Sequence, residues 1–354
     1  MKYITIKDIA RHLSISVSTV SRALGDDKNI RKETKEKVIE AAKRLGYRPN
    51  PVAINLKYGH TNTVGVIVPE MVTPFASRVI NGIQEVLHTK NIKVIIAESG
   101  GDPEKEKENL QLMERFMVDG IIICLCSYKR NKEEYARLQQ AGMPMVFYDR
   151  IPYGLEVPQV IVDDYMKSFF LVESLIRSGR KQIVHIQGPD DIYNSIERVR
   201  GYKDALAKFG IPFDKNNMLI KTGMTFEEGK KAADILVERN IPFNAIFAFT
   251  ETLAIGAMNR LRELGKKIPE EIAVASFSGT ELSNIVYPKL TTVGGYRRTA
   301  FVPDGEKSCR TYFRENQRSG ISQSFNRVGC GNQNACIDAT FGGILMTYLS
   351  DIIS

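Results

Sequence analysis

The chain has 354 residues, of which 43% are apolar and 25% charged, a composition typical of a soluble globular protein with more than one domain. The net charge of +8 is unevenly distributed, because residues 1–60 carry 13 Lys and Arg against 6 Asp and Glu, whereas residues 61–293 carry 29 against 30. The sequence shows no signal peptide and no apolar run of membrane-spanning length, so we expect a cytoplasmic protein. The basic start favours nucleic acid as a partner, although a solvated charged surface would give the same count.

The five cysteines have no paired spacing, which fits a reducing compartment. Cys124 and Cys126 fall in the apolar run 121–126 and are interpreted as buried strand residues. We therefore predict no metal site and no cofactor.

Three short helices are predicted at the start of the chain. The first is capped by Thr5 and covers about 6–12, the second is capped by Ser16 and covers 17–24, and the third covers about 32–45. A tight turn between the first two is typical of a helix-turn-helix, and a small helical bundle with a polar surface is the alternative.

The second predicted helix presents Ser18, Thr19, Ser21 and Arg22 outward. An arginine can form two hydrogen bonds with the O6 and N7 atoms of guanine, and serine and threonine hydroxyls can bind bases or phosphates. This face therefore predicts contacts in the major groove of DNA.

Three segments of this region, TIKDIA at 5–10, SVSTVSRAL at 16–24 and LGYRPN at 45–50, closely resemble the headpiece of the lac repressor (LacI/GalR) family. The resemblance implies that Val17, Ser18 and Arg22 are the main base readers. Further contacts to phosphates or flanking groups are expected from Thr5, Ser16, Thr19, Ser21 and Asn29.

Residues 50–57 resemble the hinge helix of the same family, which folds when two copies pair over the minor groove. The resemblance implies that Leu56 is a wedge between central base pairs, with Lys57 beside it and with Val52 and Ala53 on the paired apolar face. Ile54 stands where the family often carries arginine, which puts one phosphate contact in doubt.

From Thr63 the sequence alternates between apolar strands and helices, which predicts doubly wound parallel sheets covered on both faces. Strands are expected at about 64–68, 93–97, 120–126, 144–148, 182–187, 218–220, 245–249 and 272–277, and helices at about 75–88, 103–118, 132–140, 166–178, 192–209, 226–239 and 253–264. Two subdomains of this kind leave a cleft at the carboxyl ends of their strands, where ligands bind.

This region also resembles the LacI/GalR family as far as Val293, in segments such as NTVGVIVP, VDGII, VDD, ERVRGY and YPKLTTV. The resemblance implies the fold of periplasmic sugar-binding proteins, with an effector cleft edged by Phe75, Asp149, Arg150, Arg198, Glu251 and Phe277. Arg198 is the strongest candidate, because a guanidinium can bind vicinal hydroxyls or a carboxylate, and Phe75 is expected either to stack on a sugar or simply to pack.

The effector is not predicted to be that of a well-known member, because two motifs depart from the family pattern. Thr250-Glu251 stands where many members have Asn-Asp, and Phe277-Ser278-Gly279 stands where many have an Asp pair. A carbohydrate or a nucleoside-like molecule remains the expected class.

The resemblance ends after Val293, and residues 294–354 form an atypical tail that lacks helical periodicity through most of its length. A reverse translation of residues 304–317, shifted by one base, reads MGKKAAELIFEKIK, an amphipathic helix of the kind the family carries at this place. Our hypothesis is a frameshift near Val293, and a genuine variable extension is the alternative. No disulfide or metal role is assigned to Cys309, Cys330 or Cys336.

The sequence predicts four parts: a headpiece at 1–49, a hinge and linker at 50–60, an effector domain at 61–293, and the tail. The effector domain is expected to divide into 61–160 and 161–289, with a crossover at 290–293. The predicted function is a repressor that binds a pseudo-palindromic operator as a homodimer and responds to a small effector. A sugar receptor without DNA binding is the rival, and an enzyme is not favoured because the four histidines are scattered and no catalytic motif is found.

Overall fold

The computed structural model describes residues 4–49, 60–127 and 129–294. They belong to two compact units, divided between Thr61 and Asn62, and each unit is described by itself. The predicted hinge residues Val52, Ala53, Leu56 and Lys57 lie outside the described residues, as do residues 295–354 and with them the frameshift hypothesis.

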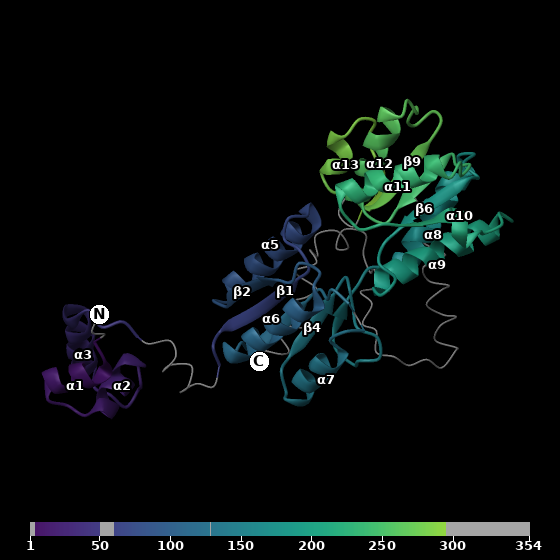
Figure 1. The fold of residues 1–354 in the computed structure, drawn as a ribbon. Helices are drawn as coiled ribbons and strands as arrows, with labels where there is room; N and C mark the ends of the chain where they lie inside the picture. The colour runs from purple at the N-terminus through teal and green to yellow at the C-terminus, as the bar shows by residue number, and fades with distance from the viewer. Residues whose placement is uncertain (1–3, 50–59, 128, 295–354) are drawn as a thin grey trace, which may run out of the picture. The chain divides into compact units, whose positions relative to one another are not determined.

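The first unit contains the three predicted helices, α1 (Ile6–Leu13), α2 (Val17–Leu24) and α3 (Lys32–Leu45) (Figure 1). Their starts follow from local chemistry: Thr5 and Asp8 form a capping box, and the Ser16 hydroxyl accepts a hydrogen bond from the backbone N–H of Thr19 at 3.0 Å. The helix-turn-helix arrangement predicted from the sequence is confirmed.

A small core holds these helices together. Ile9 of α1, Val20 of α2 and Val38 of α3 are fully buried and belong to one apolar cluster. Because the core takes one face of α2, its opposite face remains at the surface of the unit.

The second unit begins with a five-stranded parallel sheet of order β2-β1-β3-β4-β5. Its elements are β1 (Thr63–Val68), α5 (Pro74–Thr89), β2 (Lys93–Glu98), α6 (Pro103–Arg115), β3 (Gly120–Ile123), α7 (Lys132–Gln140), β4 (Met145–Tyr148) and β5 (Gln159–Val160). Side chains of β1 alternate between the faces: Val64, Val66 and Val68 pack with α5, whereas Ile67 packs in the cluster that includes α6 and α7.

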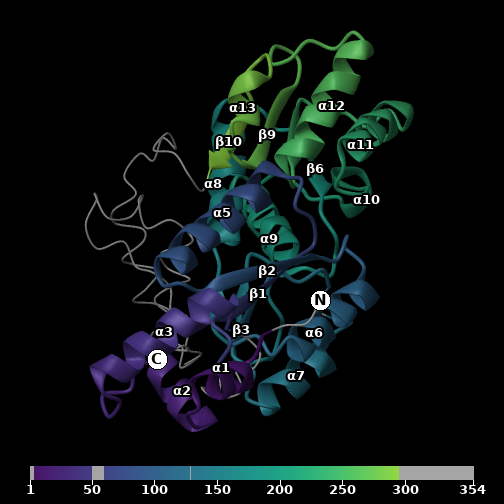
Figure 2. The same cartoon turned by 90° about the vertical axis from the view of Figure 1, so that its left-hand side faces the viewer.

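A second parallel sheet has the order β10-β9-β8-β6-β7. Its elements are α8 (Asp164–Arg177), β6 (Ile183–Gln187), α9 (Tyr193–Lys208), α10 (Lys215–Met218), β7 (Leu219–Lys221), α11 (Phe226–Glu238), β8 (Ala245–Ala248), α12 (Glu251–Glu263), β9 (Ala273–Ser278), α13 (Leu282–Ile285) and β10 (Thr291–Gly294). Helices α8 and α9 lie side by side, as do α11 and α12 (Figures 1 and 2). The predicted α/β class with two doubly wound sheets is confirmed.

Thr291–Gly294, which overlap the predicted crossover at 290–293, form an edge strand that pairs in parallel with β9, and the crossover itself stays a prediction. Two helices also begin earlier than predicted. Asp163 caps α8 and Thr250 caps α12, each through its side chain, so Asp164 and Glu251 lie in first helical turns. These caps place two carboxylates at the carboxyl-end edge of the sheet.

Candidate functional site

The exposed face of α2 is the candidate DNA-binding surface. Ser16, Val17, Ser18 and Arg22 are exposed, and Val17 retains 38% of its accessible surface although it is apolar. Thr19 and Ser21 are half-buried at the margin of this face. The residues that were predicted to read bases are therefore brought together on one side of one helix.

Hydrogen bonds order this face without blocking it. The Ser16 hydroxyl lies 2.8 Å from that of Ser18 and 2.7 Å from that of Thr19, and Arg22 Nε donates weakly to the Ser18 carbonyl at 3.4 Å. No ion pair of Arg22 occurs among the described residues. The guanidinium is thus available to an acceptor outside the unit.

Two other predicted contacts have local structural roles. The Thr5 hydroxyl donates to Asp8 at 2.7 Å and so belongs to the cap of α1. Asn29 is exposed, and its backbone N–H donates to Asp27 Oδ1 at 2.9 Å within a tight turn.

In the second unit, the candidate effector residues lie where strands end. Asp149 and Arg150 follow β4, Glu251 follows β8, and Phe277 lies near the end of β9. In parallel sheets, ligands bind at this edge. Asp149 has φ 57° and Ser278 has φ 96°, unusual backbone conformations for residues other than glycine that tend to occur at binding sites.

Arg198 is buried and engaged within the protein. Its Nε and Nη2 atoms both donate to Asp164 Oδ1 at 2.8 Å, and Nη1 donates to the Phe249 carbonyl at 2.7 Å. The rings of Phe249 and Phe277 lie 4.4 and 3.7 Å from its guanidinium carbon. The guanidinium N–H groups of Arg198 are therefore taken up by protein acceptors, so this side chain holds its neighbours in place and does not offer two free donors to a ligand. The ring of Phe277 packs on the guanidinium.

Asp164, the partner of Arg198, was not predicted as a site residue. It is almost fully buried, and burial raises its pKa to about 6 in spite of the opposing Arg198 charge, with the Asp149 charge adding to the rise. Burial likewise lowers the pKa of Lys167 on the same helix. The signal that could have identified Asp164 is its place next to a helix cap in the VDD motif.

The pH dependence of the chain's free energy of unfolding should reveal the raised pKa of Asp164. Because its pKa is higher in the folded protein than the ordinary 3.8, the folded state holds its proton more tightly, and folding is weakened by up to roughly 3 kcal/mol as pH rises from about 4 through about 6. Urea unfolding between pH 4 and 7 should show that this decrease is smaller in Asp164→Asn. Asp163→Asn is the control, since Asn also caps a helix; an unchanged pH dependence in Asp164→Asn would contradict the assignment.

The two sheets are joined at the site by side-chain contacts. Asn194 Nδ2, at the start of α9, donates to Asp149 Oδ1 at 3.2 Å, and Arg150 Nη2 lies 3.8 Å from the Met224 sulfur. Asp149 and Arg150 follow the first sheet, whereas Asn194 and Met224 belong to the second, so these contacts depend on how the halves meet.

Glu251 and Phe75 complete the predicted set. Glu251 is buried, and its Oε2 accepts from the Thr280 hydroxyl at 2.5 Å and from the Thr280 backbone N–H at 3.3 Å. Phe75 is half-buried at the start of α5 and packs on the first-sheet core. Phe75 thus packs within the protein and its stacking on a sugar stays a prediction, whereas Glu251 joins α12 to the segment after β9.

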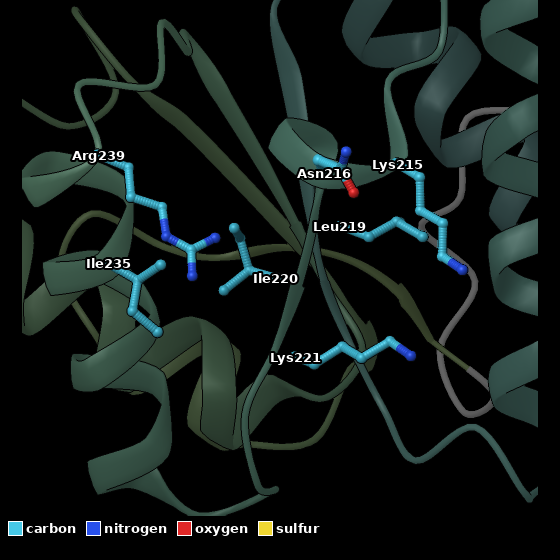
Figure 3. A pocket seen from close by; sticks show the side chains of 7 residues that line it. All are labelled: Lys215, Asn216, Leu219, Ile220, Lys221, Ile235 and Arg239. Atoms are coloured by element: carbon cyan, nitrogen blue, oxygen red, sulfur yellow. The ribbon is translucent and has the colours of Figure 1, made fainter.

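A separate pocket lies at the edge strand β7: the side chains of Ile220, Ile235 and Arg239 lie on one side of the strand, and those of Leu219 and Lys221 lie on the other (Figure 3). None of the predicted effector residues lines it. Within the described part of the chain, no group of three or more His, Cys, Asp or Glu residues could hold a metal ion, and no helix has the length and hydropathy to span a membrane.

Comparison with known proteins accounts for both units. Residues 5–50 match the model of bacterial regulatory proteins of the lacI family, and residues 61–297 match that of periplasmic binding proteins and the sugar-binding domain of the LacI family. The chain is 33% identical to catabolite control protein A of Priestia megaterium, over 82% of this chain and 87% of that protein. It is 31% identical to the transcriptional repressor CytR of Escherichia coli K12, over 82% and 84%.

Solved structures agree with this result. The transcription regulator CcpA of Lactococcus lactis superposes with a TM-score of 0.61 at 28% identity, covering 66% of this chain and 84% of that one. The lac repressor dimer bound to operator gives a TM-score of 0.71 at 22% identity, covering 90% and 94%, which supports the fold. The chain belongs to the LacI family of DNA-binding transcriptional regulators, with a helix-turn-helix headpiece and an effector domain of the periplasmic-binding-protein type.

Proposed function

We propose that this protein is a repressor that binds a pseudo-palindromic operator as a homodimer and is controlled by a small molecule, a sugar or a related metabolite. The observation that carries the proposal is the exposed row of Val17, Ser18 and Arg22 on α2, held by a three-helix core. In this arrangement the second helix enters the major groove, and two copies read two half-sites.

Relatives support each part. Repressors named PurR and CytR are 32% and 31% identical to the chain, and a regulator called CelR has been solved in complex with cellobiose. By analogy, the ligand of this chain would bind near Asp149, Asn194 and Arg198. A molecule that binds one arrangement of the two sheets better than another would shift their equilibrium and thereby the affinity for DNA.

The homodimer is supported by exposed apolar side chains on the second unit. Val72 and Tyr287 each expose 84% of their surface and Ile285 exposes 75%. An ion pair between Arg78 and Glu281 links α5 to the segment that precedes α13, so the two regions lie close together. Apolar groups at such exposure are typical of a surface that a second copy covers.

The hinge wedge, Leu56 with Val52, Ala53 and Lys57, stays a prediction within this mechanism.

A sugar receptor without DNA binding is less favoured, because it would not need a basic headpiece of this kind. We also propose that the chain has no enzymatic role, and that it acts where bacterial duplex DNA lies, in the cytoplasm.

The test is the selectivity of Arg22→Ala. The preferred duplex is first selected from a random library with the parent protein, and gel shifts then compare it with random duplex at several salt concentrations. Loss of a bidentate base contact should lower the preference about fivefold to 150-fold, through a loss of roughly 1–3 kcal/mol. Arg31→Ala, an exposed arginine outside α2, should leave the ratio unchanged. An Arg22→Ala protein as selective as its parent would overturn the proposal.

A further inference from the structure

The second sheet has an open edge at β7. Among the described residues, this strand pairs with β6 and with no other strand. The pocket of Figure 3 lies along the edge, and its lining residues come from α10, from β7 and from the C-terminal part of α11 with its cap. The main-chain groups of such an edge can bind an extended segment of another chain as an added strand.

The hydrogen bonds of the sheet show which residues of β7 face outward. The Phe249 N–H donates to the Ile186 carbonyl at 2.8 Å, so the main chain of Ile186 faces β8. Its neighbours in β6 therefore face β7 and bond the main chain of Ile220, which stands opposite Ile186 in the parallel register. Consecutive residues of a strand face opposite ways, so the main-chain groups of Leu219 and Lys221 are directed away from the sheet.

Three of these outward main-chain groups are placed to bond an added strand. The Leu219 N–H donates to the Lys215 carbonyl and so belongs to the end of α10. The other groups are the Leu219 carbonyl and the N–H and carbonyl of Lys221. Since an added strand bonds alternate residues of its neighbour, the two-residue spacing of Leu219 and Lys221 fits a chain laid beside β7.

The pocket along this edge is basic. Lys215, Lys221 and Arg239 are exposed cations of its lining, and no acidic residue lines it. Lys221 forms an ion pair with Asp190 in which both side chains are about half exposed, a kind of pair that contributes little. Lys215 and Arg239 form no ion pair within the described part of the chain. An acidic partner would therefore find two unpaired cations and one weakly paired cation.

Acids of the neighbouring elements do not cancel this charge. Asp214, before α10, accepts hydrogen bonds from the Asn216 N–H at 2.9 Å and from Asn217 Nδ2 at 2.7 Å. Two of the acids of α11 form ion pairs with a lysine and an arginine elsewhere on the helices. All four acids of that helix lie outside the lining, and they are Glu227, Glu228, Asp234 and Glu238.

The two sides of the edge differ in chemistry. Lys215 lies on the same side of β7 as Leu219 and Lys221, whereas Ile220 and Ile235 lie on the other (Figure 3). An added strand sends alternate side chains to these two sides, so acidic residues would meet the lysines and apolar residues the isoleucines. The space measures about 270 Å³, below the roughly 300–1,000 Å³ of pockets that enclose small molecules, which favours a chain laid along the edge.

We propose that the β7 edge binds an extended acidic segment of another protein, which joins the second sheet as an additional strand and directs its acidic side chains toward Lys215 and Lys221. A second copy of this chain would bring the same three cations to the edge and be repelled. Residues 294–354 carry 7 Lys and Arg against 5 Asp and Glu, so they lack the required charge. Lysines at an edge discourage uncharged strands, which adds to the selectivity for an acidic one.

This interaction lies apart from the predicted operator and effector residues, none of which lines the pocket. The inference therefore goes beyond the proposed function and does not depend on it.

The experiment measures the fluorescence polarisation of labelled ten-residue peptides titrated with the full chain. Excess random duplex DNA is present to occupy the basic headpiece. The acidic probe alternates glutamate and valine, and we expect it to bind saturably. Three control peptides should bind at least about tenfold more weakly: one with the same residues in two blocks, one with lysine in place of glutamate, and the acidic probe with N-methylated backbone amides.

Charge reversal in the protein tests the lysine side of the edge. Lys221→Glu should weaken binding of the acidic probe about tenfold and strengthen binding of the lysine probe, a reversal that a merely structural role of Lys221 would not produce. Lys266→Glu, an exposed position outside the pocket, should bind the acidic probe like the parent. If Lys221→Glu does not fold, Lys215→Glu repeats the test, and the four peptides still decide the matter with the parent chain.

Several results would contradict the proposal. One is absence of binding by the acidic probe. Equal binding of the alternating, block and N-methylated peptides, or full competition by millimolar inorganic phosphate, would indicate a surface that attracts any anion. Unchanged affinity of both probes in folded Lys221→Glu would place the binding elsewhere. Assembly of the parent beyond a dimer in sedimentation, lost in Lys221→Glu, would assign the edge to a second copy.

Discussion

Replacement of Arg198 by methionine is expected to destabilise the second unit by about 3–5 kcal/mol, since it removes one partner of a buried ion pair. Asp164 would be left buried without its two bonds from the guanidinium, and the Phe249 carbonyl would lose its donor at 2.7 Å. Methionine keeps much of the apolar contact with Phe249 and Phe277, so the loss comes mainly from the unpaired polar groups. Urea unfolding at pH 7.5 measures the change.

Two further variants make this result specific. Arg200→Met, on the same helix, removes a pair with Glu197 in which the arginine is exposed, together with its contact with the Tyr165 ring, and should cost about 1 kcal/mol. The double variant Asp164→Asn with Arg198→Met removes both charges and should recover part of the lost stability. If Arg198→Met and Arg200→Met were equally stable, the buried pair would not hold α8 against α9.

The sequence predicts elements well where their signals are local. The bounds of α2 follow from the cap at Ser16 and from Val20 and Ala23 on one face, and both signals lie within the helix itself. The apolar runs that became β1, β6 and β8 are equally local, because strands buried on both faces need such runs.

Elements that depend on distant partners were missed. Strand β10 has four residues and exists through its pairing with β9, and the two residues of β5 pair only with β4. Neither segment has enough length for periodicity to identify it.

The site shows the same division. Arg198 was predicted from its motif, but its guanidinium hydrogen bonds go to Asp164, 34 residues earlier, and to the carbonyl of Phe249, 51 residues later. The partners of Asn194 and Glu251 are likewise 45 and 29 residues away. Spacing along the chain indicates which side chains reach the edge of a sheet, whereas the hydrogen bonds that they form with one another depend on the folded geometry.

The crossing of α8 and α9, which supports the Asp164–Arg198 pair, provides the second large expected effect. A Cβ atom at Gly201 would lie 2.3 Å from the Tyr165 carbonyl oxygen and 2.9 Å from the Phe169 nitrogen. Since both are backbone atoms, the helices would have to separate. We therefore expect Gly201→Ala to destabilise the chain by about 3 kcal/mol, although alanine in an open helix stabilises it by about 1 kcal/mol.

The sign of this change distinguishes packing from helix propensity. Ala207→Gly, at an exposed position of the same helix, should destabilise by about 1 kcal/mol through propensity alone. Gly201→Ala should also respond less to the effector, because moving α9 away from α8 shifts Arg198, whose carbonyl accepts from the Ser168 hydroxyl at 2.6 Å. If Gly201→Ala had a higher urea midpoint of unfolding than the parent, the two helices would have room for a methyl group. The proposal that their close contact positions Arg198 would then be wrong.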